Sequence, residues 1–415
     1  MSTATVPPLA STARDPRLWP EGLYVHLPFC AAICTYCAFA SEIYSAERPR
    51  RYLGLLEREL ATRVAGLSRF TQGAAWDYIK EGRGATHYAP RTIFLGGGTP
   101  SALNLDELRV FFDALARHVD CSQVEEFTIE ANPGSTEAQK LEFLLSRGVN
   151  RISFGVQSFQ PHLLKLLGRV HGATQGREAV SLARAAGFTN VSIDLMHGLP
   201  TQSREDLDRD LDEALALNVD HISAYGLMYE DGTPLKAAVE RGQTARLAPE
   251  EEAAHYVRVM ERLEAGGLPQ YEISNYAKPG REAQHNLIYW RNEAYLGVGV
   301  SAAGCVGGER YTNHYEMNDY QGQLEQGRDP VETRETLSGE AKAREALVLE
   351  LRLRRGVDAQ DFARRWGVNP ELDEPLAGTL KKFASLGLME RTSDGRWRIA
   401  QASLPVADGI LSELV

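Results

Sequence analysis

The sequence predicts an α/β protein: a partial (β/α)6 barrel followed by a small α+β C-terminal domain of winged-helix type. Over residues 23–227, six short apolar runs alternate with amphipathic segments of helical period, a pattern typical of a parallel sheet wrapped by helices. From residue 338 onward, three helical segments precede two short strand-like runs. The chain has 415 residues, enough for two or three domains.

Each of the six predicted strands ends near glycine or polar residues. They are LYVHLP (23–28), RTIFLGGG (91–98), EEFTIEAN (125–132), NRISFGVQ (150–157), NVSIDLMHGLP (190–200) and DHISAYGL (220–227). Amphipathic helices are predicted between them, among others over 50–67, 105–119 and 203–217. In barrels of this kind the chemistry lies at the carboxyl ends of the strands. We therefore expect the functional residues there.

The domain organisation follows from changes in pattern along the chain. We expect a flexible N-terminal tail over 1–22, the barrel over 23–245, a connecting region over 246–337 and the C-terminal domain over 338–415. Residues 68–90 resemble a surface insertion before the second strand. The connecting region begins with a helix over 248–265, and the C-terminal domain carries helices over 338–353, 358–366 and 370–386 before a hairpin over 388–400.

Composition and charge narrow the class of protein. A hydrophobic share of 43% with 24% charged residues is that of an ordinary soluble protein. The formal net charge of −11 argues against nucleic acid as a partner, and residues 338–415 contain no basic run. The N-terminus lacks the pattern of a signal peptide, and no apolar run approaches the roughly 18 residues of a spanning helix. We expect a cytoplasmic protein, with peripheral contact at a membrane left open.

Three of the five cysteines fall within eight residues, with the spacing C-x3-C-x2-C. Cys30, Cys34 and Cys37 follow the first predicted strand, and soft thiolates suit an iron–sulfur cluster. Three thiolates can bind three of the four iron atoms of a cube-shaped iron–sulfur cluster and leave the fourth iron without a protein ligand. A closed zinc site needs a fourth ligand, which only His26 could supply. The two remaining cysteines are isolated and are expected to be inert: Cys121 and Cys305.

This cysteine spacing after the first strand of a barrel resembles the signature of the radical S-adenosylmethionine (radical SAM) superfamily. The resemblance implies a [4Fe–4S] cluster whose open iron chelates the amino and carboxylate groups of SAM. Reduction of the cluster then cleaves SAM to a 5′-deoxyadenosyl radical. Tyr36, just before the last cysteine, corresponds to the aromatic residue that approaches the adenine in that family.

The resemblance extends to the remaining strand ends. LGGGTPS (95–101) is similar to the glycine-rich strand of the superfamily, where the backbones of Gly97 and Gly98 would bind the SAM amino group. Carboxylates and an amide would bind the ribose and the amine, and an arginine would pair with a carboxylate. An ordinary tight turn, helix caps and ion pairs are the alternatives. The other predicted SAM residues are Tyr24, Tyr36, Thr99, Glu130, Gln157, Arg169 and Asp194.

Five short sequence motifs together resemble those of the HemN/HemW branch of this superfamily, and the resemblance covers roughly residues 22–400. The motifs are YVHLPFC, GGGTP, EANP, FGVQS and DLMHGLP. The branch contains oxygen-independent coproporphyrinogen III oxidases and haem chaperones. The oxidases carry a further cysteine two residues after the triplet, where this chain has Phe39, and a longer segment before the first strand. Both departures favour the haem chaperones.

A second feature that favours the chaperones is the HNxxYW motif, which runs from His285 to Trp290. The resemblance implies that this motif binds haem. An imidazole such as His285 can be an axial ligand, and Tyr289 and Trp290 can pack on a macrocycle. Asn286 and Arg291 could support the imidazole or a propionate. The alternative is a hydrogen-bonded core histidine beside two aromatic residues.

The resemblance thus implies a HemW-like haem chaperone with a [4Fe–4S] cluster and SAM as cofactors and haem as cargo. Its partners would be recipient haemoproteins, such as respiratory enzymes at the membrane. A homodimer when cluster-loaded is also implied. The enzymatic alternatives are coproporphyrinogen III oxidation and a HemN-like methyltransferase, so whether the chain catalyses a reaction stays open.

Overall fold

The computed structural model describes residues 17–67 and 88–415. Most of the expected insertion (68–90) and of the expected N-terminal tail lies outside these ranges. The last residues of that tail, 17–22, are packed: Trp19 meets Tyr88 edge to face at 6.5 Å, and the Glu21 N–H donates to Ala294. The first strand begins at Gly22.

A twelve-stranded sheet forms the centre of the molecule, in the order β14-β13-β12-β11-β1-β4-β5-β6-β7-β8-β10-β9. Its six central strands run parallel, as predicted. The sheet ends at β14 and β9 and does not close, so the barrel is partial, and the predicted fold class is confirmed. The six strands are β1 (Gly22–Leu27), β4 (Thr92–Gly97), β5 (Glu126–Ala131), β6 (Arg151–Gln157), β7 (Asn190–His197) and β8 (His221–Gly226).

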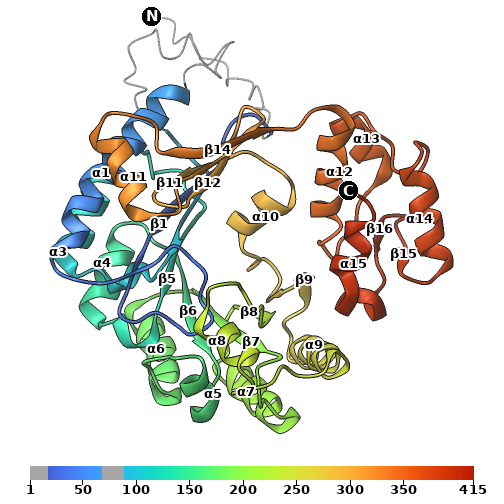
Figure 1. The fold of residues 1–415 in the computed structure, drawn as a ribbon, viewed down its shortest axis with the longest axis horizontal. Helices are drawn as coiled ribbons and strands as arrows, with labels where there is room; N and C mark the ends of the chain where they lie inside the picture. Colours follow the sequence, from blue (N-terminus) through green and yellow to red (C-terminus); the bar gives the residue numbers. More distant parts are fainter. Residues whose placement is uncertain (1–16, 68–87) are drawn as a thin grey trace, which may run out of the picture.

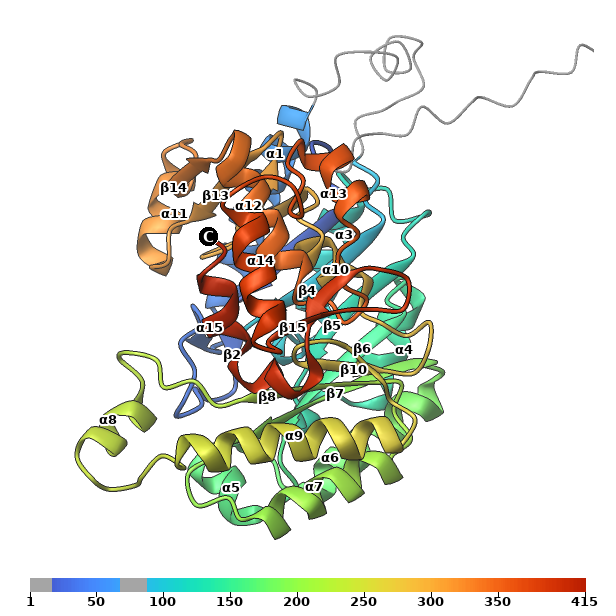
Figure 2. The same cartoon turned by 90° about the vertical axis from the view of Figure 1, so that its right-hand side faces the viewer.

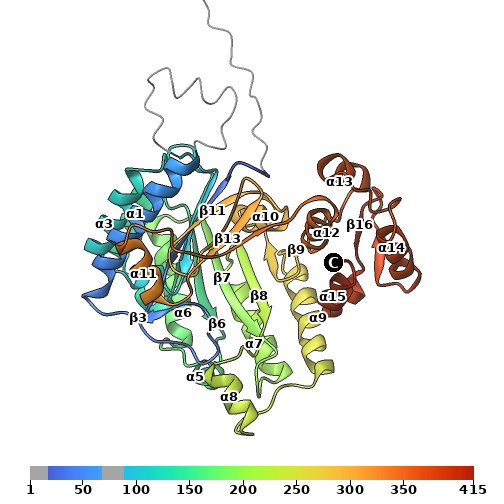
Figure 3. The same ribbon diagram turned by 45° about the horizontal axis from the view of Figure 1, so that its top comes forward.

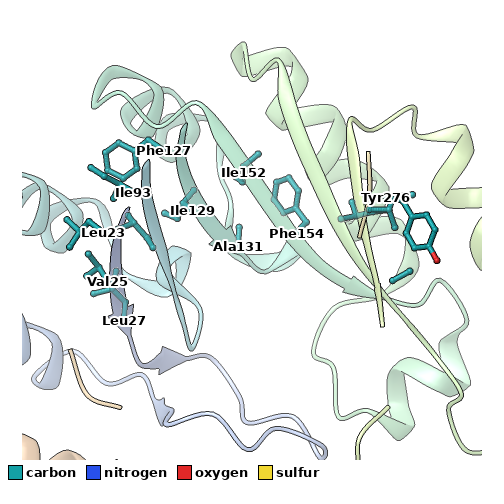
Figure 4. Close-up of a cluster of buried hydrophobic side chains, with 14 of the residues drawn as sticks. Leu23, Val25, Leu27, Ile93, Phe127, Ile129, Ala131, Ile152, Phe154 and Tyr276 are labelled. Atoms are coloured by element: carbon teal, nitrogen blue, oxygen red, sulfur yellow. The ribbon is translucent and has the colours of Figure 1, made fainter. Parts of the chain in front are cut away.

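Helices cover one face of these strands (Figure 1), because alternate strand residues are apolar and point toward them. Leu23, Val25 and Leu27 of β1 belong to this buried layer, with matching residues on the neighbouring strands (Figure 4). The opposite set, including Tyr24 and His26, faces the barrel interior. The covering helices are α1 (Arg48–Gly66), α3 (Leu105–Ala116), α4 (Ala138–Ser146), α6 (Ala173–Ala186) and α7 (Arg204–Ala216), with the shorter α5 (Pro161–Leu166). Helix α8 (Pro234–Glu240) follows β8 and stands apart from this layer in Figure 2.

The region expected to be a connection supplies both edges of the same sheet. On one side, β11 (Tyr295–Val298) pairs in parallel with β1, and three antiparallel strands follow it. On the other side, β10 pairs with β8. Four of these edge strands span only three or four residues, which is too few for a period of two to be recognised in the sequence. The further elements are β9 (Gln270–Glu272), β10 (Asn275–Ala277), β12 (Ala303–Val306), β13 (Glu309–Asn313), β14 (Val331–Thr336), α9 (Pro249–Ala265), α10 (Gln284–Trp290) and α11 (Met317–Glu325).

The C-terminal domain lies beside the open side of the sheet (Figures 2 and 3) and consists of helices and one hairpin, as predicted. Its third predicted helix starts six residues later than expected, after Pro375. Among the described residues, no helix has both the length and the apolar character needed to cross a membrane. The elements are α12 (Gly339–Glu350), α13 (Ala359–Trp366), α14 (Leu376–Ser385), β15 (Met389–Arg391), β16 (Trp397–Ile399) and α15 (Ala407–Ser412).

Candidate cluster and cofactor site

The three cysteines lie on one loop at the carboxyl end of β1. The loop leaves the barrel through β2 (Phe29–Cys30) and returns in β3 (Glu42–Ile43), which pairs with β2. Contacts from distant segments hold it, among them two hydrogen bonds: the Thr35 N–H donates to the Leu167 carbonyl at 3.1 Å, and the Tyr315 hydroxyl donates to the Ala38 carbonyl at 3.0 Å. The loop is therefore fixed by tertiary contacts.

The sulfur atoms have polar neighbours that suit metal-bound thiolates. The Cys30 sulfur lies 3.6 Å from the Thr99 hydroxyl, and the Arg169 guanidinium donates to the Cys34 sulfur at 3.2 Å. Burial raises the pKa of the Cys30 thiol to about 11 and also raises the pKa of the Cys37 thiol. Binding of iron would displace these protons, and hydrogen bonds to the sulfurs would tune the metal centre.

A cluster and a single metal ion make different demands on the three cysteines. Within residues 17–67 and 88–415, no three His, Cys, Asp or Glu side chains converge on one ion position. A cubane takes each thiolate at a different iron atom, so it needs sulfurs that surround a larger group. All three thiols are free of disulfides, so each is available to a separate iron atom. His26, the one nearby ligand considered for zinc, has both ring nitrogens engaged, at 2.8 Å from the Ala40 carbonyl and 3.0 Å from the Tyr24 hydroxyl.

The glycine-rich end of β4 packs directly against the cysteine loop. A Cβ atom on Gly98 would lie 2.5 Å from the Pro28 backbone and 3.0 Å from the Cys30 sulfur. Gly97 has a φ of 110°, and a Cβ there would lie 2.7 Å from the His26 ring. Both positions therefore require glycine on steric grounds. Their contact with the SAM amino group stays a prediction.

Two carboxylates face the barrel interior below this loop. Burial, with the nearby Asp194, raises the pKa of Glu130 to about 8. Burial also raises the pKa of Asp194, although the Ser153 hydroxyl donates to it at 3.1 Å. Such carboxylates favour a ligand that brings positive charge and hydroxyl groups. A sulfonium, an amine and a ribose, the groups that SAM carries, meet that need.

The remaining predicted SAM residues lie around the same opening. Tyr36 packs against the small apolar cluster of Leu163, Leu167, Met196 and Leu199, which Tyr225 also contacts. The Gln157 amide oxygen accepts from the Tyr225 hydroxyl at 2.9 Å. The second Arg169 nitrogen donates to the Gly155 carbonyl at 2.5 Å. The structure thus brings the cysteines and the predicted SAM residues to one end of the barrel.

The HNxxYW motif lies at the opposite, amino end of the strands. It forms α10, whose first N–H groups are capped by one carboxylate: Gln284 and His285 donate to Glu126 at 2.8 and 3.0 Å. Glu126 and Thr92 begin β5 and β4, so α10 covers the amino end of the barrel, on the side away from β2 and α8 in Figure 2. The motif therefore covers the amino end of the barrel, and we call α10 (Gln284–Trp290) the floor of the barrel.

His285 is completely buried in this floor. Its Nδ1 lies 2.7 Å from the Thr92 hydroxyl and its Nε2 lies 2.8 Å from the Tyr289 hydroxyl. The ring stacks on Phe94 at 5.3 Å, and burial lowers its pKa to about 3. Both ring nitrogens of His285 therefore have hydrogen-bond partners in this structure, as in the alternative of a hydrogen-bonded core histidine. Axial ligation of haem iron by His285 stays a prediction, and it would require iron to displace one of these partners.

The other motif residues differ in surroundings. Tyr289 meets Tyr295 edge to face at 4.6 Å. Trp290, at the end of α10, is half-buried and lies 5.4 Å from the Arg352 guanidinium of the C-terminal domain. Asn286 is half-buried. Haem contacts by these three residues stay predictions.

Two interior residues were not expected from the sequence. Phe94 stacks between His285 and Tyr24, at 6.2 Å from the Tyr24 ring, and so joins the floor to the cofactor end. Arg151 on β6 is 2% exposed, and it lowers the pKa values of Glu130 and Asp194. Both residues alternate with core residues along their strands. That period of two was the signal that could have revealed them.

The fold and the site together define a radical SAM protein. The family model described as the radical SAM superfamily matches residues 24–214, and that described as the HemN C-terminal domain matches residues 337–404. Among solved structures, coproporphyrinogen III oxidase (HemN) from Escherichia coli is similar with a TM-score of 0.79 over 97% of this chain and 91% of that one, at 22% identity. This likeness shows the fold.

Relatives with higher identity define the family more narrowly. Heme chaperone HemW of Bacillus subtilis is 36% identical over 385 residues, which span 92% of this chain and 96% of the relative. Heme chaperone HemW of Escherichia coli is 38% identical over 293 residues, 70% of this chain and 71% of the relative. The chain belongs to the HemW family.

Proposed function

We propose that this chain is a haem chaperone that binds haem and delivers it to recipient haemoproteins, with a [4Fe–4S] cluster and SAM as cofactors. The observation that carries the proposal is its 36% identity to a haem chaperone along 92% of its length. Phe39, where the oxidases have a further cysteine, supports it. Recipients at a membrane, a cytoplasmic location and dimerisation on cluster loading belong to the same proposal.

In this proposal, Cys30, Cys34 and Cys37 hold the cluster. When bound, the reduced cluster supplies the electron that cleaves SAM. The residues that would bind SAM lie beside the loop: Glu130 and Asp194 offer carboxylates to its amine and ribose hydroxyls. The other residues assigned to SAM are Tyr24, Tyr36, Gly97, Gly98, Thr99, Gln157 and Arg169.

Anaerobic haem transfer tests the proposal. Cluster-reconstituted protein is loaded with haem and mixed with an apo-haemoprotein, with and without SAM, and transfer is followed by the absorption of the recipient. We expect transfer from the reconstituted protein and slower transfer from protein without cluster. Absence of stable haem binding would contradict the proposal. Conversion of coproporphyrinogen III to protoporphyrinogen IX by the same sample would instead favour the oxidase alternative.

A further inference from the structure

Six exposed apolar residues lie on the cysteine loop or in segments that contact it. Of the thirteen large hydrophobic residues that are exposed in the described part of the chain, six lie there. Phe39 and Met228 are each 71% exposed. Grouped apolar residues on a surface mark a place where another molecule binds. We name this group the cluster-side apolar surface: Ile33, Phe39, Ile43, Val170, Met228 and Tyr315.

Three members belong to the cysteine loop itself. Ile33 precedes Cys34, and Phe39 comes two residues after Cys37. Ile43 lies opposite Cys30 in the pairing of β2 with β3. These side chains therefore stay at the cluster end of the barrel because the same backbone carries the thiols.

The other three come from distant segments that contact this loop. Val170 follows Arg169, which donates to the Cys34 sulfur, and Tyr315 donates its hydroxyl to the Ala38 carbonyl at 3.0 Å. Met228 follows Leu227, which packs in the same small apolar cluster as Tyr36 of the loop. The surface is thus built from four parts of the chain.

The chemistry of this surface matches a flat macrocycle with an iron centre and carboxylates. Phe39 and its neighbours offer apolar contact, and the exposed thioether of Met228 is a known type of axial ligand to haem iron. Lys165 is exposed and has no ion-pair partner among the described residues. It lies on α5, next to the Leu166 carbonyl that accepts from the Thr35 hydroxyl at 2.8 Å.

We propose that haem docks on the cluster-side apolar surface, with Met228 as a ligand to its iron and Lys165 beside its propionates. The inference rests on the proposed function and adds the location of the cargo. It places the iron at an exposed side chain, whereas His285 of the HNxxYW motif is fully buried with partners at both ring nitrogens. Haem held on an open surface is accessible to a recipient. Its position beside the cysteine loop would let the state of the cluster act on haem release.

Anaerobic haem titrations of cluster-reconstituted, SAM-loaded full-length protein test this inference. We expect Phe39→Ser and Val170→Ser each to raise the haem Kd, the first at least tenfold. Leu372→Ser is the matched control, because Leu372 is 75% exposed but lies in the C-terminal domain. Iron and sulfide content is measured for every variant, so that loss of haem binding is not confused with loss of cluster. His285→Ala is expected to keep the wild-type Kd.

Met228→Leu separates ligation from apolar contact. It keeps an apolar side chain but removes the thioether, so we expect an altered haem absorption and magnetic circular dichroism spectrum. A spectrum identical to that of the wild type would overturn the assignment of Met228.

Unchanged haem affinity in Phe39→Ser and Val170→Ser would overturn the docking surface, while haem transfer by the wild type would still support the proposed function. No saturable haem binding by the wild type would overturn both. Light scattering on the same samples measures self-association, and so tests whether a second copy of the chain occupies the surface instead of haem. Loss of self-association with unchanged haem affinity would assign the surface to a second copy of the chain and overturn the inference.

Discussion

The two ends of the barrel carry the two most conspicuous motifs of the sequence, and they are built in opposite ways. At the carboxyl end the cysteine loop leaves three free thiols, and two interior carboxylates nearby have raised pKa values. At the amino end, the polar groups of His285 on α10 are already engaged: the residue is fully buried, and both its ring nitrogens and its backbone N–H have hydrogen-bond partners. The first end is ready to bind ligands, whereas the second stabilises the barrel.

The strongest test of this contrast is removal of one cysteine. We expect Cys30→Ala to lose nearly all of its stable cluster, because two thiolates on a half-buried loop cannot hold three irons. Iron and sulfide analysis after anaerobic reconstitution measures the effect. Cys121→Ala is the control, since that cysteine lies outside the loop. A full, stable cluster in Cys30→Ala would refute the ligand assignment.

The amino end predicts an effect on stability instead. His285→Ala removes two buried hydrogen-bond partners and a stacked ring, so we expect the free energy of unfolding to fall by about 3 kcal/mol. Urea unfolding measures it. His162→Ala, which removes a largely exposed ring, should change stability little. If His285→Ala has the same free energy of unfolding as the wild type, the contacts of His285 do not stabilise the amino end of the barrel.

The two ends also predict opposite dependence of stability on pH. The pKa of His285 is lowered to about 3, so the folded state binds fewer protons than the unfolded state, and this residue makes stability rise between about pH 3 and 6.5. The pKa of Glu130 is raised to about 8 from 4.5, so it makes stability fall as pH rises through that range. Each slope is at most about 1.4 kcal/mol per pH unit.

Unfolding of the cluster-free protein at a series of pH values measures these slopes. We expect Glu130→Gln to remove the loss of stability on approach to pH 8, and His285→Asn to flatten the acid limb. Identical pH profiles for wild type and Glu130→Gln would mean that Glu130 is already ionised in the folded protein.

The smallest effect expected concerns the glycine-rich turn. Gly98→Ala places a methyl group against the Pro28 backbone, so we expect a loss of about 1–2 kcal/mol in stability together with a weaker cluster. Gly54→Ala on α1 is the matched control: nothing lies within 4 Å of its Cβ position, and alanine should stabilise the helix by about 0.5–1 kcal/mol. Thermal unfolding and iron content distinguish the two.

How far the sequence predicts this molecule depends on the range of the contacts involved. The six central strands are predictable because apolar residues recur within each short run, as Ile152, Phe154 and Val156 do in β6 (Arg151–Gln157). The edge strand β9 spans only three residues, too few for a period to appear. The cysteine triplet is also local, and its spacing identifies the site before any tertiary contact is known.

The role of His285 could not be predicted in the same way. Its partner Thr92 lies 193 residues away, and Glu126, which accepts from its backbone, lies 159 residues away. The residue types of the motif suit both haem ligation and a buried floor, so composition and spacing do not separate the two. Only the fold shows that the imidazole nitrogens are taken.

The placement of α10 has a consequence for synthesis of the chain. The six parallel strands are complete at Gly226, but the helix that closes their amino end starts at Gln284, and β1 gains its second neighbour only with β11. At translation rates of roughly 5–20 residues per second, the interior therefore stays open to water for several seconds after the last of those strands is made. During that interval Thr92 and Glu126 have only water to bind, and a nascent chain is most exposed to aggregation.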